Sequence, residues 1–373
     1  LCPPYPGEPW PEGFIDEAWR EAVTEAVSGY NRGVEAYQAQ DFKNAVKAYE
    51  EALEKLSKAP FPLLKAYLCT NLGVVYRHLG HYEEALEKYE EARRVFVERE
   101  MWVDVAKVDR NMGVVYDKLG RYEEALRKYE EARRVFVERE MWVKVADVDV
   151  NMGVVYRGLG RYEEALRKYE EARRVYVEQG MWVDVADVDM NMGVVYTELG
   201  QYEEALRKYE EARRVYVAHE MWVTVAHMDV NMGVVYADLG RYEEALGKYE
   251  EARRVYVAHE MWVKVAEVDV NMGVVYDELG RYEEALRKYE EARRVFVERE
   301  MWVAVAKVDE NMGVVYRHLG QYEEALRKYE EARRVFVEHE MWVDVADVDV
   351  NMGNVYAQLG RYEEALGKYE EAL

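Results

Sequence analysis

The segment NMGVVYDKLGRYEEALRKYEEARRV, residues 111–135, recurs with few changes every 40 residues up to the end of the chain. A fixed period of this kind predicts a stack of one supersecondary unit, in which each unit contacts only its neighbours. The chain should therefore carry repeated surfaces rather than one unique active site. Successive copies open at Asn71, Asn111, Asn151, Asn191, Asn231, Asn271, Asn311 and Asn351, and a divergent copy opens at Asn31.

Each copy is predicted to hold two helices joined by a tight turn. Apolar residues recur at helical spacing over residues 101–119 and again over residues 122–137. Gly120, between the two segments, stands where a helix C-cap glycine is expected. So short a turn forces the two helices to pack antiparallel. Pairs such as Glu124 with Lys128 are expected on a solvated outer face, each adding about 0.2–0.5 kcal/mol to helix stability.

A glycine recurs in the middle of each first helix. Gly113 is one example, and glycine at such a position costs about 1 kcal/mol relative to alanine. Its recurrence in every copy predicts a compensating gain. We expect that gain to be close approach of the paired helix, opposite Ala125 and Ala132.

The spacing of the small and aromatic residues resembles that of the tetratricopeptide repeat over essentially all of residues 15–373. The period of 40 residues, rather than 34, and the Asn-x-Gly opening are similar to the long repeats of kinesin light chains and Pins-type scaffold proteins. The resemblance implies an all-α, right-handed superhelical solenoid of antiparallel helix pairs. It also implies an inner groove, lined by the first helices, that binds peptides or proteins. The residues that carry the resemblance are Gly113, Tyr116, Gly120, Tyr122, Ala125, Tyr129 and Ala132.

The chain divides into three regions. Residues 1–14 are proline-rich and predict an extended arm or linker. Residues 15–61 form a divergent first helix pair, and residues 62–373 contain the near-identical copies. The last copy stops within its second helix, so nine helix pairs are expected, the last truncated. We expect the chain to be a fragment of a longer protein, or its last helix to continue.

Charge and composition narrow the classes of partner. The net charge of -24 repels phosphate backbones and anionic lipid, so a basic protein partner is favoured over nucleic acid or membrane. Cys2 and Cys69 are the only cysteines and do not make a disulfide framework. The cytoplasm, or another reducing intracellular compartment, is the expected location. Nucleotide-binding, zinc and nucleophile motifs are lacking in the sequence, so no cofactor, metal or catalytic residue is predicted.

Variation between copies indicates which surface carries function. On the first helix, the columns of Asp104, Lys107, Arg110, Asp117 and Lys118 vary, and they lie with Val114 within an arc of about 140°. The resemblance implies that this arc faces the groove; neutral drift of an exposed face is the alternative. In the middle of the chain the arc should be negative, since only Lys264 opposes its acids. These are Asp184, Asp187, Glu198, Asp238, Glu267, Asp277 and Glu278.

An asparagine column borders the same arc. Asparagine is a mediocre helix former, because its amide competes for backbone hydrogen bonds. The resemblance implies that these amides bind the backbone of an extended peptide, since an amide both donates and accepts. An inter-helix hydrogen bond within the stack is the alternative. The predicted groove residues of this kind are Asn111, Asn151, Asn191, Asn231, Asn271 and Asn311, with Val154, Val194 and Val234 beside them.

Three further columns receive structural interpretations. The aspartates typified by Asp149 should be partly buried and paired with an arginine or tyrosine of an adjacent helix. The tryptophans from Trp102 to Trp342 are expected in core or inter-repeat packing rather than in cation cages. The histidines of the turns between copies are not expected to bind metal, because other copies carry Arg or Gln there. They are His219, His259 and His339.

Together these features predict a non-enzymatic scaffold that binds a protein or peptide, and that needs no cofactor. One alternative is a structural subunit that uses its ends or convex face, with end-to-end stacking on a copy or a neighbour. Another is the sensor region of a longer multidomain protein. Near-identity of the copies favours the structural alternative, because a groove adapted to one ligand tends to diversify.

Overall fold

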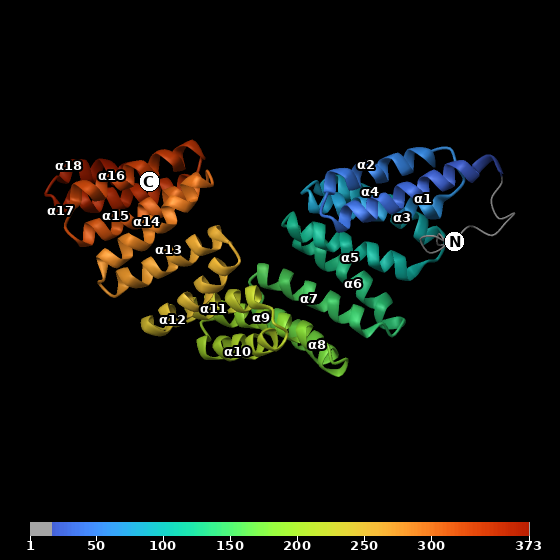
Figure 1. Ribbon diagram of the computed structural model, residues 1–373, viewed down its shortest axis with the longest axis horizontal. Coiled ribbons are helices and arrows are strands. Elements are labelled where there is room, and N and C mark those ends of the chain that lie inside the picture. The colour runs from blue at the N-terminus through green and yellow to red at the C-terminus, as the bar shows by residue number, and fades with distance from the viewer. Residues whose placement is uncertain (1–16, 373) are drawn as a thin grey trace. The chain divides into compact units, whose positions relative to one another are not determined.

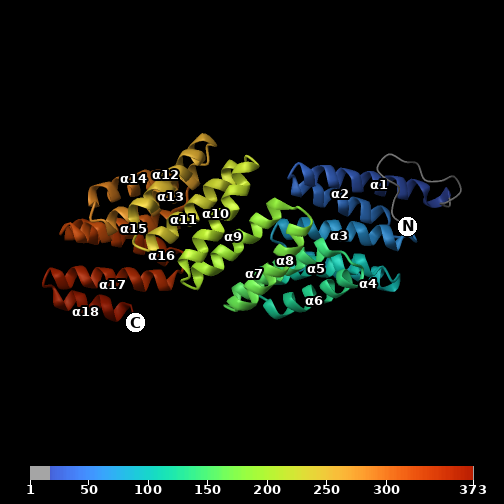
Figure 2. The ribbon, with the colours of Figure 1, turned by 90° about the horizontal axis from the view of Figure 1, so that it is seen from below.

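The computed structural model describes residues 17–372, and every regular element in that range is an α-helix. The predicted arm, residues 1–14, lies outside the described residues. Figures 1 and 2 show the helices following one another as antiparallel pairs. The chain divides into two compact units, one up to Asn191 and one from Met192, so that α9, Trp182–Glu198, spans the boundary.

The helices match the predicted register closely. The divergent first pair comprises α1, Glu17–Gln38, and α2, Phe42–Lys55. The rest of the first unit contains α3 Pro62–His78, α4 Tyr82–Glu98, α5 Trp102–Lys118, α6 Tyr122–Glu138, α7 Trp142–Gly158 and α8 Tyr162–Glu178. The second unit contains α10 Tyr202–Ala218, α11 Trp222–Asp238, α12 Tyr242–Ala258, α13 Trp262–Glu278, α14 Tyr282–Glu298, α15 Trp302–His318, α16 Tyr322–Glu338, α17 Trp342–Gln358 and α18 Tyr362–Glu371.

The turn within each pair is closed by the predicted glycine. Gly120 has a φ of 70°, a conformation that glycine adopts at little cost. The backbone N–H of Arg121 donates to the carbonyl of Tyr116 at 2.8 Å, as in a Schellman motif. The prediction of a C-cap at this position is confirmed.

Close approach at the mid-helix glycine is also confirmed, but its predicted partner is wrong. A Cβ added to Gly113 would lie 2.5 Å from the ring of Tyr129, not against Ala125 or Ala132. Tyr129 is fully buried. The glycine therefore makes room for a tyrosine ring that crosses from the second helix onto the first. The other near-identical copies repeat the contact, from Gly73 with Tyr89 to Gly353 with Tyr369.

A buried charge network joins each repeat to the next. Asp149 of α7 accepts hydrogen bonds from Arg133 of α6 and from Lys168 of α8, and Lys168 also contacts Glu171. The predicted arginine partner is thus confirmed for this aspartate. Arginine Nε also donates to the aspartate in the copies that contain Asp189, Asp229 and Asp269, at 2.8 Å each.

The lysine of this network was not anticipated. Lys128, expected on the solvated face with Glu124, is buried and donates to Asp109 at 2.9 Å. Glu124 is instead bound by Arg121 at the start of the same helix. Helical spacing alone pairs Glu124 with Lys128, but the aspartate of the first helix lies on the buried side of the lysine and attracts it.

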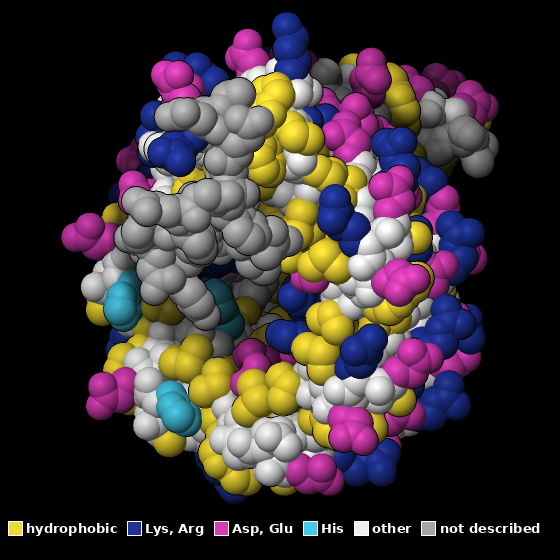
Figure 3. Space-filling model, turned by 90° about the vertical axis from the view of Figure 1, so that its right-hand side faces the viewer, with side chains coloured by type: hydrophobic (Ala, Val, Ile, Leu, Met, Phe, Trp, Pro, Cys, Tyr) yellow, Lys and Arg dark blue, Asp and Glu magenta, His cyan; other side chains and the backbone are white. Residues whose placement is uncertain are grey.

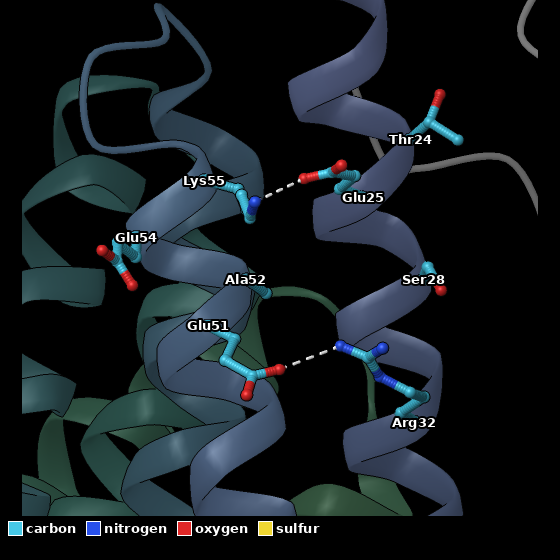
Figure 4. A pocket seen from close by; sticks show the side chains of 8 residues that line it. All are labelled: Thr24, Glu25, Ser28, Arg32, Glu51, Ala52, Glu54 and Lys55. Carbon is cyan, nitrogen blue, oxygen red and sulfur yellow. Dashed lines mark hydrogen bonds and ion pairs between the residues drawn. The ribbon is translucent and has the colours of Figure 1, made fainter.

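The first helix pair presents a polar face where the later first helices are apolar. Val105, Val108 and Met112 of α5 are buried, whereas Glu25, Ser28 and Arg32 hold the matching positions in α1. Lys55 pairs with Glu25 at 2.8 Å and Arg32 with Glu51 at 3.1 Å across α1 and α2, as Figure 4 shows. Polar and charged side chains therefore occupy the positions at which apolar side chains contact the preceding repeat elsewhere.

Candidate peptide-binding face

The first helices form one side of each unit. Backbone contacts link α3 with α5 and α5 with α7 in the first unit, and α11, α13, α15 and α17 in succession in the second. In the described part of the chain, the backbones of successive second helices are not in comparable contact. Long side chains bridge these helices instead, as in the ion pairs of Arg133 with Glu171 and Arg253 with Glu291. The first helices thus lie on the tighter side of each unit, where the resemblance places a groove. We call this side the first-helix face.

Side chains also cross between successive first helices on this face. Arg110 of α5 lies 3.6 Å from Asp147 of α7, and Asp147 also pairs with Lys144. Asn351 of α17 donates to Glu310 of α15 at 3.4 Å. Variable-arc side chains of successive first helices thus meet in the first unit, and a variable-arc glutamate meets a residue of the asparagine column in the second.

All six predicted groove asparagines have amides without a protein partner among the described residues. Among residues 17–372, the side chains of the six predicted asparagines make no hydrogen bond to protein, although all six are only partly exposed. Asn351 is different, because it takes the inter-helix bond to Glu310. The alternative, an inter-helix hydrogen bond within the stack, is therefore seen for Asn351. It is not seen for the six predicted groove residues, Asn111, Asn151, Asn191, Asn231, Asn271 and Asn311.

The valines beside the asparagines present an apolar strip. Val154 and Val194 are half-buried, whereas Val234 and Val274 are exposed. Each is one helical turn from an asparagine, so apolar and amide groups alternate along the face. Such a surface offers hydrogen bonds to a peptide backbone and apolar contact to its side chains.

The predicted acidic residues differ in how far they are already neutralised. Glu267 is paired with Lys264 at 2.7 Å, and Asp277 accepts from His318 at 3.0 Å. Glu198 and Asp238 are exposed and form no ion pair with another described residue. In the first unit Asp184 is partly buried, and Asp187 is exposed but has an interaction partner. Glu278 accepts a long hydrogen bond from the Tyr242 hydroxyl at 3.5 Å.

Sequence reasoning missed a tyrosine on the second helix that reaches this face. The hydroxyl of Tyr176 donates to Asp147 at 2.9 Å, and burial followed by the Asp147 charge raises the tyrosine pKa. Phe136 holds the matching position opposite Lys107, and Tyr256 lies against His227. The residues at the positions of Asp147 and Tyr176 vary together between copies, and this joint variation could have revealed the contact.

A family model for the tetratricopeptide repeat matches residues 25–96, 62–138, 144–218, 224–297 and 304–373. The chain belongs to the tetratricopeptide repeat family. A search of curated proteins found no match.

Solved structures share the tetratricopeptide fold at low identity. The quorum sensor NprR from B. thuringiensis superposes with a TM-score of 0.64 and 16% identity, over 94% of this chain and 98% of the other. The aspartyl phosphate phosphatase F from Bacillus subtilis gives 0.61 and 13%, over 96% and 94%. A Rap protein complexed with competence and sporulation factor gives 0.56 and 16%, over 94% and 97%.

Three other kinds of feature bear on function in the described part of this tetratricopeptide repeat chain: a metal site, a pocket and a membrane span. The described residues contain no group of His, Cys, Asp and Glu side chains that would hold a metal ion. A pocket of about 590 Å³ between α1 and α2 is lined by the paired charges of the first helix pair (Figure 4). Within the described range, no helix combines the length and apolar character that a membrane span requires.

The expectation that the tryptophans lie in the core is wrong. The seven tryptophans that begin the first helices from α5 to α17 are 42–62% exposed. The methionine before the tryptophan packs against the core in several copies, as Met101, Met261 and Met341 do, whereas Met301 is exposed. The exposed set comprises Trp102, Trp142, Trp182, Trp222, Trp262, Trp302 and Trp342.

Proposed function

We propose that this tetratricopeptide repeat protein is a non-enzymatic scaffold that binds an extended protein or peptide segment along its first-helix face. The observation that carries the proposal is the set of six asparagine amides without a protein partner on that face. An unpaired amide inside a helix offers no benefit to the helix itself. It can instead donate to and accept from a peptide bond without reading the side chains of the ligand.

Two structural neighbours make peptide binding a reasonable use of the fold. One is a Rap protein solved with competence and sporulation factor, and another is a quorum sensor. Their identity to this chain is 16%, so the likeness supports the fold and the ligand class remains our proposal.

The charge of the face favours a basic ligand. Glu198 and Asp238 have no cationic partner among the described residues, and the chain carries a net charge of -24. In the first unit the basic side chains Arg110 and Lys144 are occupied by Asp147. Lysine or arginine side chains of a ligand would find unpaired carboxylates mainly along the second unit.

Selection from a display library of random peptides, with the full chain as bait, tests the proposal. Peptides recovered in this way should be rich in Lys and Arg. They should lose affinity when Asn231, Asn271 and Asn311 are changed together to Leu, which keeps the size of the side chain but removes the amide. Each lost hydrogen bond between neutral groups should reduce the binding free energy by about 0.5–1.5 kcal/mol.

The matched control replaces Asn351 by Leu, because its amide already binds Glu310. That variant should bind the selected peptides nearly as the wild type does. Peptides whose binding survives the triple substitution would contradict the proposal and direct attention to the ends or the convex side of the stack.

A further inference from the structure

A ridge of exposed tryptophans lies apart from the first-helix face. Each stands at the first position of a first helix, directly after the turn that connects it to the preceding second helix. Val217, Val257 and Val337, in the last turns of second helices, are also exposed near these turns. Figure 3 faces the N-terminal helices rather than these residues, and there too apolar side chains are exposed among acidic and basic ones. In the second unit we call Trp222, Trp262, Trp302 and Trp342 the tryptophan ridge.

The ridge repeats one exposed tryptophan at the start of each of four successive first helices. A tryptophan side chain offers up to roughly 250 Å², so four half-exposed rings leave several hundred Å² of apolar surface. Monomeric proteins rarely expose apolar patches beyond a few hundred Å², and such patches mark interaction sites. None of the four rings belongs to the core clusters of the second unit, although Met261 and Met341 do pack there.

Carboxylates without partners flank the ridge. Glu220, Glu260, Glu300 and Glu340 are exposed, two residues before each tryptophan, and their carboxylates bind no other described residue. Each has a φ of 54–55°, which disfavours a side chain, and one turn of the first unit has Gly180 there instead. A glutamate kept in a left-handed conformation that glycine would adopt freely suggests a use for its charge.

These features fit a cationic ligand better than a second copy of this chain. Two copies would bring chains of net charge -24 together, and a negative glutamate lies in each ridge turn, although Arg299 offsets the charge of Glu300. A lysine or arginine side chain, by contrast, gains from the tryptophan ring face and from the neighbouring carboxylate.

We propose that the tryptophan ridge is a docking surface for an extended Arg- or Lys-rich polypeptide, with one cationic side chain over each ring. Successive first helices are in contact, so they lie about 8–10 Å apart. A chain in the extended polyproline II conformation advances about 3.1 Å per residue with three residues per turn, so every third side chain lies on the same face and can stand over the next ring. The ridge therefore selects a spacing of cations and not merely a positive charge.

The test measures fluorescence anisotropy of a labelled peptide that repeats Arg-Gly-Ser, titrated with the full chain. A control peptide has the same composition with its arginines contiguous. We expect the spaced peptide to bind at least about tenfold more tightly, the sum of several cation–π contacts. Changing all four ridge tryptophans to Leu should remove this preference. Equal binding of both peptides, unaffected by that change, would overturn the proposal.

A second variant keeps the test decisive if the first fails to fold. Changing Glu220, Glu260, Glu300 and Glu340 to Gln leaves the rings in place and should weaken the spaced peptide. The control variant carries four Glu→Gln changes on the outer face and should bind the spaced peptide as the wild type does. Its changes are at Glu130, Glu170, Glu290 and Glu330. Retained affinity in the turn variant would contradict the proposal.

Two further outcomes separate the ridge from other surfaces. Lysine substitution of Glu198 and Asp238 on the first-helix face should leave the preference for the spaced peptide intact; its loss would move this peptide to the first-helix face. Light scattering should show no dimer that the tryptophan variant dissociates. Such a dimer would assign the ridge to a second copy and overturn the proposal.

Discussion

Arg133 of α6 holds Asp149 of α7 through two hydrogen bonds, from Nε to Oδ1 at 2.7 Å and from Nη2 to Oδ2 at 3.1 Å. Asp149 is almost fully buried. Because Lys168 of the same repeat binds the same carboxylate, one aspartate connects three helices. The same geometry in other copies, such as Arg253 with Asp269, makes it a repeated clamp between neighbours.

Replacing Asp149 by Ala should destabilise the stack by up to about 3–5 kcal/mol, because the partly exposed Arg133 and the mostly buried Lys168 lose the buried anion that they share. Urea unfolding followed by circular dichroism measures this. Changing Arg133, Asp149 and Lys168 together to Leu should restore much of the loss, since apolar residues replace a buried ion network at little cost. As a control, removing the exposed ion pair between Arg121 and Glu124 should change the free energy of unfolding little. A triple variant as unstable as the single one would show that the lost charges are not the cause.

The mid-helix glycine gives a second prediction. A Cβ on Gly193 would stand 2.5 Å from the Tyr209 ring, so Gly193→Val should overpack the pair and cost about 1–3 kcal/mol. Gly247, in α12, is the matched control, because a Cβ there meets nothing within 4 Å. Gly247→Ala should raise the free energy of unfolding by about 1 kcal/mol through helix propensity. A neutral result at Gly193 in the same unfolding measurement would disprove the close-approach argument.

The sequence was sufficient for most of the fold because its signals are local and repeated. Helical periodicity, the C-cap at Gly120 and the period itself predicted each pair and its boundaries. What required coordinates was the choice between partners at equal helical spacing. Lys128 turned inward to Asp109 rather than toward Glu124, and Tyr129 rather than an alanine faced Gly113.

The candidate site was less accessible to sequence reasoning. Exposure of a large side chain depends on the path of the chain at a turn, so the apolar character of Trp102 predicted packing where the structure places it outside. The charge of the first-helix face also depends on which pairs form between repeats, as Asp277 with His318 shows. Residue counts along an arc cannot reveal such pairing.

A pH-dependent contribution to stability is expected from Glu310 of α15. Burial, then the nearby charges of Asp347 and Asp344, raises its pKa to about 7 from 4.5. The folded state therefore retains a proton that the unfolded state releases between these values. Protonated Glu310 is compatible with the folded state at low pH. The free energy of unfolding should therefore fall as pH rises from about 4.5 to about 7, because the unfolded state releases the proton first.

Comparison of the wild type with Glu310→Gln isolates this effect. The variant should gain stability relative to the wild type between pH 5 and pH 8, by up to about 3 kcal/mol. Urea unfolding at both values measures the difference, and Glu330→Gln on the exposed outer face is the control. A difference that does not change with pH would show that Glu310 titrates normally.

The most direct test of binding along the first-helix face is calorimetric titration, at low salt, of the full chain with a basic peptide recovered by display. Changing Asp187, Glu198, Asp238 and Glu278 together to Lys reverses the charge of that face. We predict that this variant no longer binds. The affinity of the wild type should also fall with added salt, since exposed charges are screened over about 8 Å at physiological ionic strength. A control with Glu130, Glu170, Glu290 and Glu330 changed to Lys alters the net charge equally and should still bind. Unchanged affinity in the face variant would contradict the account and place the binding surface elsewhere.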